Sequence, residues 1–234
     1  MNAQAILKEL EPLGADGYRK ILMNHGVTGP CYGVKIEHLK KYQSRIKKDY
    51  QLALDLYDTG VYDAMYLAGL IADDEQMTSK DLQRWLDRAC APLASSTVPW
   101  VAAGNPHARE IALKWIESKK DIEAAAGWAT LGCLVALKDD KDLDLAELKR
   151  LLQRVEKEIN KAPNETRYKM NSFVIAVGTY VKPLNGFAKE VAERIGEVTV
   201  DMGNTACKVP FAPEHIRKAE ARGAIGKKRK TVKC

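Results

Sequence analysis

LALDLYDTGVYDAMYLAGL, residues 52–70, is echoed later in the chain by IALKWIESKKDIEAAAGWATL, residues 111–131. In both stretches apolar residues recur three and four positions apart, and a short polar turn, DTG or ESKK, interrupts the pattern. This spacing is typical of amphipathic helices. Each stretch therefore predicts a hairpin of two helices.

The similarity continues beyond the hairpins, because IADDE at 71–75 and ALKDDK at 136–141 each end an apolar run with two aspartates. The apolar residues that follow match at an offset of 66 positions: Leu82, Trp85 and Leu86, then Leu148, Leu151 and Leu152. Helical pairs that cannot bury their apolar faces alone are stabilised by stacking on similar neighbours. The sequence therefore predicts an all-α fold, an α-solenoid of HEAT-like helical repeats forming an ARM/HEAT superhelix.

The predicted domain organisation follows from the extent of this pattern. The run 122–137 is apolar nearly all round, so neighbouring helices must cover it on both sides. Further helices are predicted from Asn164 and again after Pro183, and no segment alternates as a strand would. We expect one repeat domain over 1–200 and a C-terminal extension with a basic tail over 201–234.

Composition limits the class of protein. The 234 residues carry a net charge of +6 with a pI of about 8.9, a balance that suits polyanionic partners without identifying one. The five cysteines form no CxxC pair, and no run of 18 apolar residues or signal-peptide pattern occurs. These features predict a cytoplasmic protein with reduced thiols and no membrane partner.

Two basic segments could contact phosphates. The predicted helix VKIEHLKKYQSRIKK, residues 34–48, presents these cations: Lys40, Lys41, Arg45, Lys47 and Lys48. The final segment GKKRKTVKC, residues 226–234, could hold phosphates as a flexible tail, with these candidates: Lys227, Lys228, Arg229 and Lys230. A solvated helix face and an unstructured, solubilising end are equally compatible with these patterns.

The tryptophans are the candidate aromatic contacts. Trp85 lies on an apolar helix face, where core packing is the leading interpretation and ligand contact the alternative. Trp115 is in register with a core face. Trp100 follows a proline in a predicted loop and is the most free to meet a ligand, while Trp128 in the all-apolar helix fits either role.

Conventional catalytic signatures are absent. The four histidines have no cysteine or carboxylate at metal-ligand spacing, so no metal site is predicted. GxSxG, GxxxxGK[ST] and GxGxxG do not occur, which removes the commonest hydrolase, P-loop and dinucleotide-binding classes. The sequence predicts no cofactor.

The segment YGVKIEHLKKYQSRIKKDYQLALDLYDTGVYDAMYLAGLIADDE, residues 32–75, together with VDMGNTACKVP at 200–210 and the basic end, resembles the AlkD-type DNA alkylation repair proteins. The likeness extends from about Tyr32 to Ile195. These bacterial DNA glycosylases are built from HEAT-like repeats. The resemblance implies a concave basic surface that cradles duplex DNA, and removal of positively charged alkylated purines from it.

The resemblance also implies a tryptophan followed four residues later by an aspartate, which stabilises a cationic sugar. Trp85 is the best match, but Ala89 stands four residues on, so the usual acid is absent. Asp87 remains as the candidate acid, although it points away from Trp85 on a helix. An arginine expected in the next repeat falls on a segment that offers Trp128 instead.

Two functions are therefore compatible with the sequence. One is a DNA-binding repair protein, for which the resemblance implies glycosylase activity with Asp87 as acid and with aromatic contacts from Trp85, Trp100 and Trp128. The other is a non-catalytic scaffold that binds DNA or a protein. Base excision needs stabilisation of a developing positive charge, so a carboxylate facing the DNA would distinguish the two.

Overall fold

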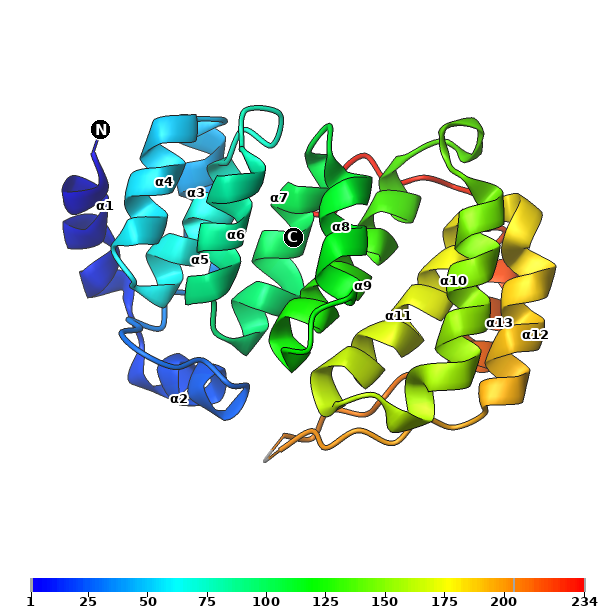
Figure 1. Ribbon diagram of the computed structural model, residues 1–234. Coiled ribbons are helices and arrows are strands. Elements are labelled where there is room, and N and C mark those ends of the chain that lie inside the picture. The colour runs from blue at the N-terminus through cyan, green and yellow to red at the C-terminus, as the bar shows by residue number, and fades with distance from the viewer. Residues whose placement is uncertain (1, 204, 234) are drawn as a thin grey trace. The chain divides into compact units, whose positions relative to one another are not determined.

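The computed structural model describes residues 2–203 and 205–233, and most of the chain forms helices connected by short turns (Figure 1). The N-terminal half contains α1 (Ala3–Leu10), α2 (Asp16–Asn24), α3 (Ile36–Ile46), α4 (Tyr50–Asp58), α5 (Tyr62–Ile71), α6 (Ser79–Arg88) and α7 (Val98–Gly104). The remainder contains α8 (Ala108–Ile116), α9 (Asp121–Leu137), α10 (Leu145–Glu158), α11 (Asn164–Tyr180), α12 (Asn185–Ile195) and α13 (Ala212–Ala221). The described residues contain no strand, only an isolated bridge between Gly14 and Val34, so the all-α prediction is confirmed.

The helices form two compact units, each with its own core. Among the described residues, unit 1 comprises 2–107 with 203, 205 and 233, and unit 2 comprises 108–202 with 206–232. The split into a repeat domain over 1–200 and an extension over 201–234 stays a prediction. The extension is nevertheless part of the packing, because α13 packs on α11 and α12.

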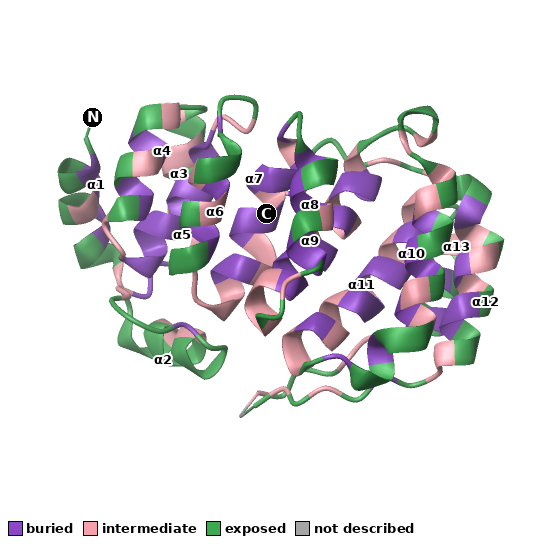
Figure 2. Ribbon diagram, viewed as in Figure 1, coloured by how far each residue is buried: buried purple, intermediate pink, exposed green. Residues whose placement is uncertain are grey.

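The first predicted hairpin is α4 and α5 in unit 1. Asp49 caps α4 by accepting a hydrogen bond from the backbone N–H of Leu52 at 3.0 Å. Gly60 allows the tight turn into α5 because its φ of +72° is one that other residues rarely adopt. All residues of α5 are buried, and Figure 2 shows this helix in purple along its length. The first repeat therefore supplies the central helix of unit 1.

The second predicted hairpin is α8 and α9 in unit 2. Gly127 brings the two helices into close contact, since a Cβ at that position would lie 2.7 Å from the backbone nitrogen of Ile116. On its other side α9 packs against α11. This confirms that the apolar run is covered by neighbours on both sides.

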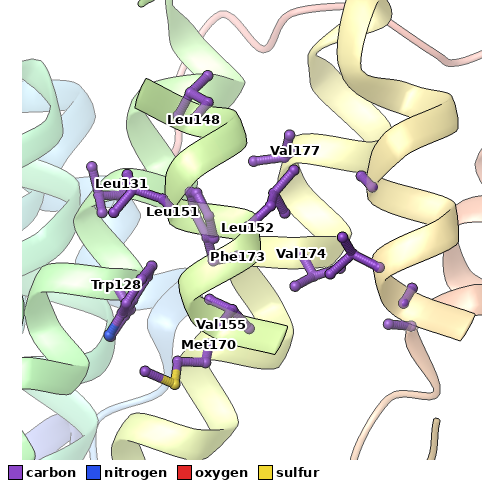
Figure 3. Packing of buried hydrophobic residues seen from close by; sticks show 14 of the residues in the cluster. Trp128, Leu131, Leu148, Leu151, Leu152, Val155, Met170, Phe173, Val174 and Val177 are labelled. Atoms are coloured by element: carbon purple, nitrogen blue, oxygen red, sulfur yellow. The ribbon is translucent and has the colours of Figure 1, made fainter. Parts of the chain in front are cut away.

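The core of unit 2 lies between α9, α10, α11 and α12 (Figure 3). The rings of Trp128 and Phe173 are 5.2 Å apart at an interplanar angle of 57°, a favourable tilted arrangement. Leu148, Leu151 and Leu152 are buried against them, which confirms that the matched apolar positions belong to the core. No helix in the described residues has the length and apolarity needed to span a membrane.

Candidate functional site

Trp85 belongs to the core of unit 1. Its side chain is fully buried and stacks on Tyr57 with ring centroids 4.1 Å apart and an interplanar angle of 5°. The Tyr57 hydroxyl donates to the backbone oxygen of Trp85 at 2.8 Å. The structure thus shows Trp85 as a core residue, which is the leading interpretation of its sequence pattern, and its contact with a ligand stays a prediction.

Trp128 is also fully buried, beside Phe173. The guanidinium of Arg154 lies 5.9 Å from the centroid of its ring, so its other neighbour is a protein cation rather than solvent. Of the two roles that the sequence leaves open for Trp128, the structure shows core packing, and a ligand contact stays a prediction. Trp115 is buried, in agreement with its assignment to the core.

Trp100 differs from the other tryptophans, all of which the structure describes, because its side chain is only half-buried. It lies within α7, so the predicted loop is wrong. Its ring meets Tyr66 of α5 edge-on, with centroids 5.6 Å apart and an interplanar angle of 89°. The prediction that Trp100 is the tryptophan most free to meet a ligand agrees with this exposure.

Gly104 stands four residues after Trp100 on the same helix. The pattern implied by the resemblance is a tryptophan followed four residues later by an acid. Trp100 and Gly104 have the same spacing as Trp85 and Ala89, and in neither pair is the second residue an acid. A Cβ on Gly104 would lie 2.4 Å from Oδ2 of Asp74. The missing side chain therefore makes room for a carboxylate from another part of unit 1.

Asp74 is neutralised by the end of the chain. The ammonium of Lys233 lies 2.6 Å from its Oδ1 and also donates to the backbone oxygen of Ala72 at 3.0 Å. The two side chains are only 18% and 12% exposed. Burial raises the pKa of Asp74 and Lys233 acts to lower it. The carboxylate beside α7 is thus tied into an internal ion pair.

Two other carboxylates in unit 1, Asp87 and Asp63, can be compared as candidates for a catalytic acid. Asp87 is exposed, accepts a hydrogen bond from the Gln83 amide at 3.0 Å and borders an open pocket of about 400 Å³. Asp63 is buried and accepts from the backbone N–H groups of Tyr32 and Val34, both at 2.7 Å. Asp63 therefore stabilises the loop that contains Tyr32 and Val34. Asp87 stays a candidate for the catalytic acid, and its exposure is the one feature that supports this role.

The basic stripe is shorter than predicted, because α3 ends at Ile46 and Lys47 and Lys48 follow it. Arg45 pairs with Glu9 at 3.2 Å, and Lys48 lies 3.6 Å from Asp73. Lys40 and Lys41 on α3, and Lys47 just after it, are exposed. These three cations of the stripe are available to an external anion.

The basic tail is docked rather than flexible, which corrects the prediction. Lys228 lies 2.8 Å from Asp140 and donates to the backbone oxygen of Val135 at 2.9 Å. Lys228 thus forms an ion pair with an aspartate of the second repeated DD sequence, and Lys233 forms one with an aspartate of the first. Lys227, Arg229 and Lys230 are exposed and could still contact phosphates.

Lys169 on α11 is a cation that sequence reasoning missed. It lies near the half-buried Cys133 of α9, and its Nζ is 5.2 Å from the ring centroid of Tyr168. Burial lowers the pKa of Lys169, while Cys133 and Glu165 act to raise it. In the sequence Lys169 is one polar residue in a helical segment, so no local pattern indicates its environment.

The comparisons with known proteins relate these features to a family. A model of the family described as DNA alkylation repair enzyme matches residues 6–179. This chain belongs to the DNA alkylation repair enzyme family. The match spans both copies of the repeated hairpin and most of the helices described above.

Relatives of this DNA alkylation repair family member match nearly end to end. Uncharacterised proteins of Listeria innocua and Listeria monocytogenes are each 32% identical over 220 residues, which cover 92% of this chain and 95% of either relative. A solved structure is 34% identical with a TM-score of 0.92, and the match covers all of both chains. It is described as belonging to a new family of proteins related to the HEAT-like repeat DNA glycosylases, with affinity for branched DNA structures.

These matches confirm that the DNA alkylation repair family member has a HEAT-like repeat fold. Within the described residues no group of three or more histidine, cysteine or acidic side chains is arranged to hold a metal ion.

Proposed function

We propose that this protein binds DNA with a branch or junction and does not excise bases. The observation that carries the proposal is the full-length match to the solved structure with affinity for branched DNA, at 34% identity and a TM-score of 0.92. The net charge of +6 supports a polyanionic partner. Branched DNA differs from linear duplex in presenting bases that are not fully stacked.

The acidic groups support binding over catalysis. Removing a base requires stabilisation of the developing positive charge of the sugar, and a carboxylate directed at that charge is the most direct source of it. Gly104 provides none, and Asp74 already has a cation 2.6 Å away. The half-buried ring of Trp100 suits a different task, because an aromatic side chain can stack on an unpaired base.

The test is a binding titration by fluorescence anisotropy with a four-way junction and a linear duplex of the same sequence. We expect tighter binding to the junction. Trp100→Ala should raise the Kd for the junction by roughly 5- to 150-fold, since one stacked base contributes about 1–3 kcal/mol. Trp100→Phe, which keeps an aromatic ring against Tyr66, should restore most of the affinity.

A second assay follows release of base from DNA that carries a cationic methylated purine. We expect no release above the rate without protein. Catalytic release would refute the non-enzymatic part of the proposal, and equal affinity for junction and duplex would refute the preference for branches. Absence of binding to either DNA would favour a scaffold that binds protein.

A further inference from the structure

Unit 2 has an open face formed by α9 and α11, which we call the α9–α11 face. Its residues are half-buried and recur three and four positions apart on each helix: Ala129, Gly132 and Cys133 on α9, and Lys169, Ser172 and Ala176 on α11. The two rows adjoin, since a Cβ on Gly132 would lie 3.7 Å from that of Ala176. Because most of these side chains are small, a bulky partner can approach both helix backbones.

Lys169 brings an uncompensated charge to this face. Within the described part of the chain no carboxylate lies within 4 Å of its Nζ, and its charged neighbourhood consists of Cys133 and Glu165. The partial burial that lowers the pKa of Lys169 is unfavourable to its charged form. An anion placed beside the ammonium would offset that cost.

Arg229 brings a second cation whose position is fixed by the main chain. Its backbone N–H donates to the oxygen of Ala136, at the end of α9, at 2.8 Å. The preceding residue, Lys228, is bound to Asp140. The exposed guanidinium itself has no carboxylate within 4 Å among the residues described, unlike Arg154, which pairs with Glu117 and Glu158.

Both cations lie near the same thiol. Burial raises the pKa of Cys133 to about 11, and Lys169 and Arg229 act in the opposite direction. Two positive charges from different segments therefore act on the same thiol of the α9–α11 face. Protein cations held in place without a protein counter-ion are suited to an external anion, and a guanidinium matches the oxygens of a phosphate.

We propose that Lys169 and Arg229 together bind the phosphate backbone of DNA on the α9–α11 face of unit 2. The proposal rests on the proposed function and adds a location to it. Phosphate contacts position DNA without reading bases, so the pair should act on junction and duplex alike. Preference for branches would then depend on other groups, such as Trp100.

The first experiment measures the Kd of the full chain for the four-way junction between about 0.05 and 0.3 M salt, over which the Debye length falls from about 14 Å to about 6 Å. Lys169→Gln and Arg229→Gln should each reduce the log–log salt slope by about 0.9 and weaken binding roughly eightfold at 0.1 M salt. Lys114→Gln is the matched control, because Lys114 is an exposed lysine on α8. Its slope should not change. Thermal unfolding verifies that each variant is folded.

The second experiment measures acetylation of lysines in the full chain by acetic anhydride, read by peptide mass spectrometry. Junction DNA should slow the acetylation of Lys169 and leave Lys114 unaffected. Inorganic phosphate serves as the probe if the chain binds no DNA. Protection of Lys169 by phosphate would then support the anion site while the proposed function fails.

The outcomes separate the two proposals. Binding by the unmodified chain with unchanged slopes in both glutamine variants would overturn the Lys169–Arg229 site and leave the proposed function standing. An equal loss in Lys114→Gln would also overturn it, because the effect would then come from net charge alone. Equal acetylation of Lys169 with and without either probe would overturn the site independently of DNA binding.

Discussion

Asp74 is a buried carboxylate whose counter-ion comes from the other end of the chain. Lys233→Gln would leave it without that cation, and loss of a charged hydrogen bond at a buried site should lower the free energy of unfolding by roughly 2–3 kcal/mol at pH 7. Urea unfolding followed by circular dichroism measures the change. The double variant Asp74→Asn with Lys233→Gln, which has no unpaired charge, should recover part of the loss.

The same variant gives a prediction for pH. Burial raises the pKa of Asp74 and Lys233 opposes this, so removing Lys233 should raise that pKa further. A carboxyl whose pKa is higher in the folded state is destabilising when charged, and this cost disappears as the pH falls through the folded-state pKa. The stability deficit of Lys233→Gln should therefore shrink from pH 7 toward acidic pH. A deficit that does not change with pH would mean that Asp74 is not its cause.

Gly104 is required by its contact with Asp74, since an added Cβ would meet the Oδ2, Cβ and Cγ atoms at 2.4 to 2.9 Å. Gly104→Ala should lower the free energy of unfolding by roughly 1–3 kcal/mol through overpacking. Gly186→Ala in α12 is the control, because nothing lies within 4 Å of its Cβ position. That change should be neutral or stabilising, and equal destabilisation by both would show that steric contact is not the reason.

At the scale of elements, α8 depends on one large side chain for its position in unit 2. Trp115 is 1% exposed, so Trp115→Ala should lower the free energy of unfolding by about 3–5 kcal/mol. Lys114→Ala, an exposed neighbour on the same helix, should change it by less than about 0.5 kcal/mol. Chemical denaturation measures both. A neutral Trp115→Ala would mean that α8 does not need this side chain for packing.

The helices themselves could be predicted because apolar periodicity is a local property. The two hairpins and the all-round apolar helix that became α9 were recognisable from residues 52–71 and 111–137 alone. The segment around Trp100 was misjudged because Pro99 suggested a loop. A proline in the first turn of a helix needs no hydrogen-bond partner, so it is compatible with α7.

The candidate site was harder to predict because its contacts join distant residues. No residue near Lys228 or Lys233 in the sequence indicates that each binds an aspartate of a repeated pair. The basic pattern alone therefore predicts a flexible tail. Likewise Lys169 and Arg229 are 60 positions apart in the sequence, and both lie near the thiol of Cys133 on α9. Trp85 matches the family's tryptophan by its place in the sequence, yet its clear amphipathic helix is the pattern of a core residue.

For the molecule as a whole, residues beyond 200 complete unit 2. Ile216 of α13 is fully buried, and a Cβ on Gly178 of α11 would lie 2.5 Å from its Cδ1. A chain that ends at residue 200 loses this contact, and we expect a lower midpoint of urea unfolding. Ile216→Ala in the full chain should show a smaller shift in the same direction, corresponding to about 2–5 kcal/mol. An unchanged midpoint of urea unfolding in the shortened chain would mean that α13 does not contribute to the stability of unit 2.

The ion pair of Asp74 and Lys233 also sets an order of events during protein synthesis. Residues 1–107 of unit 1 leave the ribosome first, whereas the lysine that neutralises Asp74 is made 126 residues later. At about 5–20 residues per second, the nascent unit spends roughly 6–25 s with this carboxylate uncompensated. Unit 1 therefore passes through a weaker early form, and it reaches its final stability only after Lys233 has been added and has paired with Asp74.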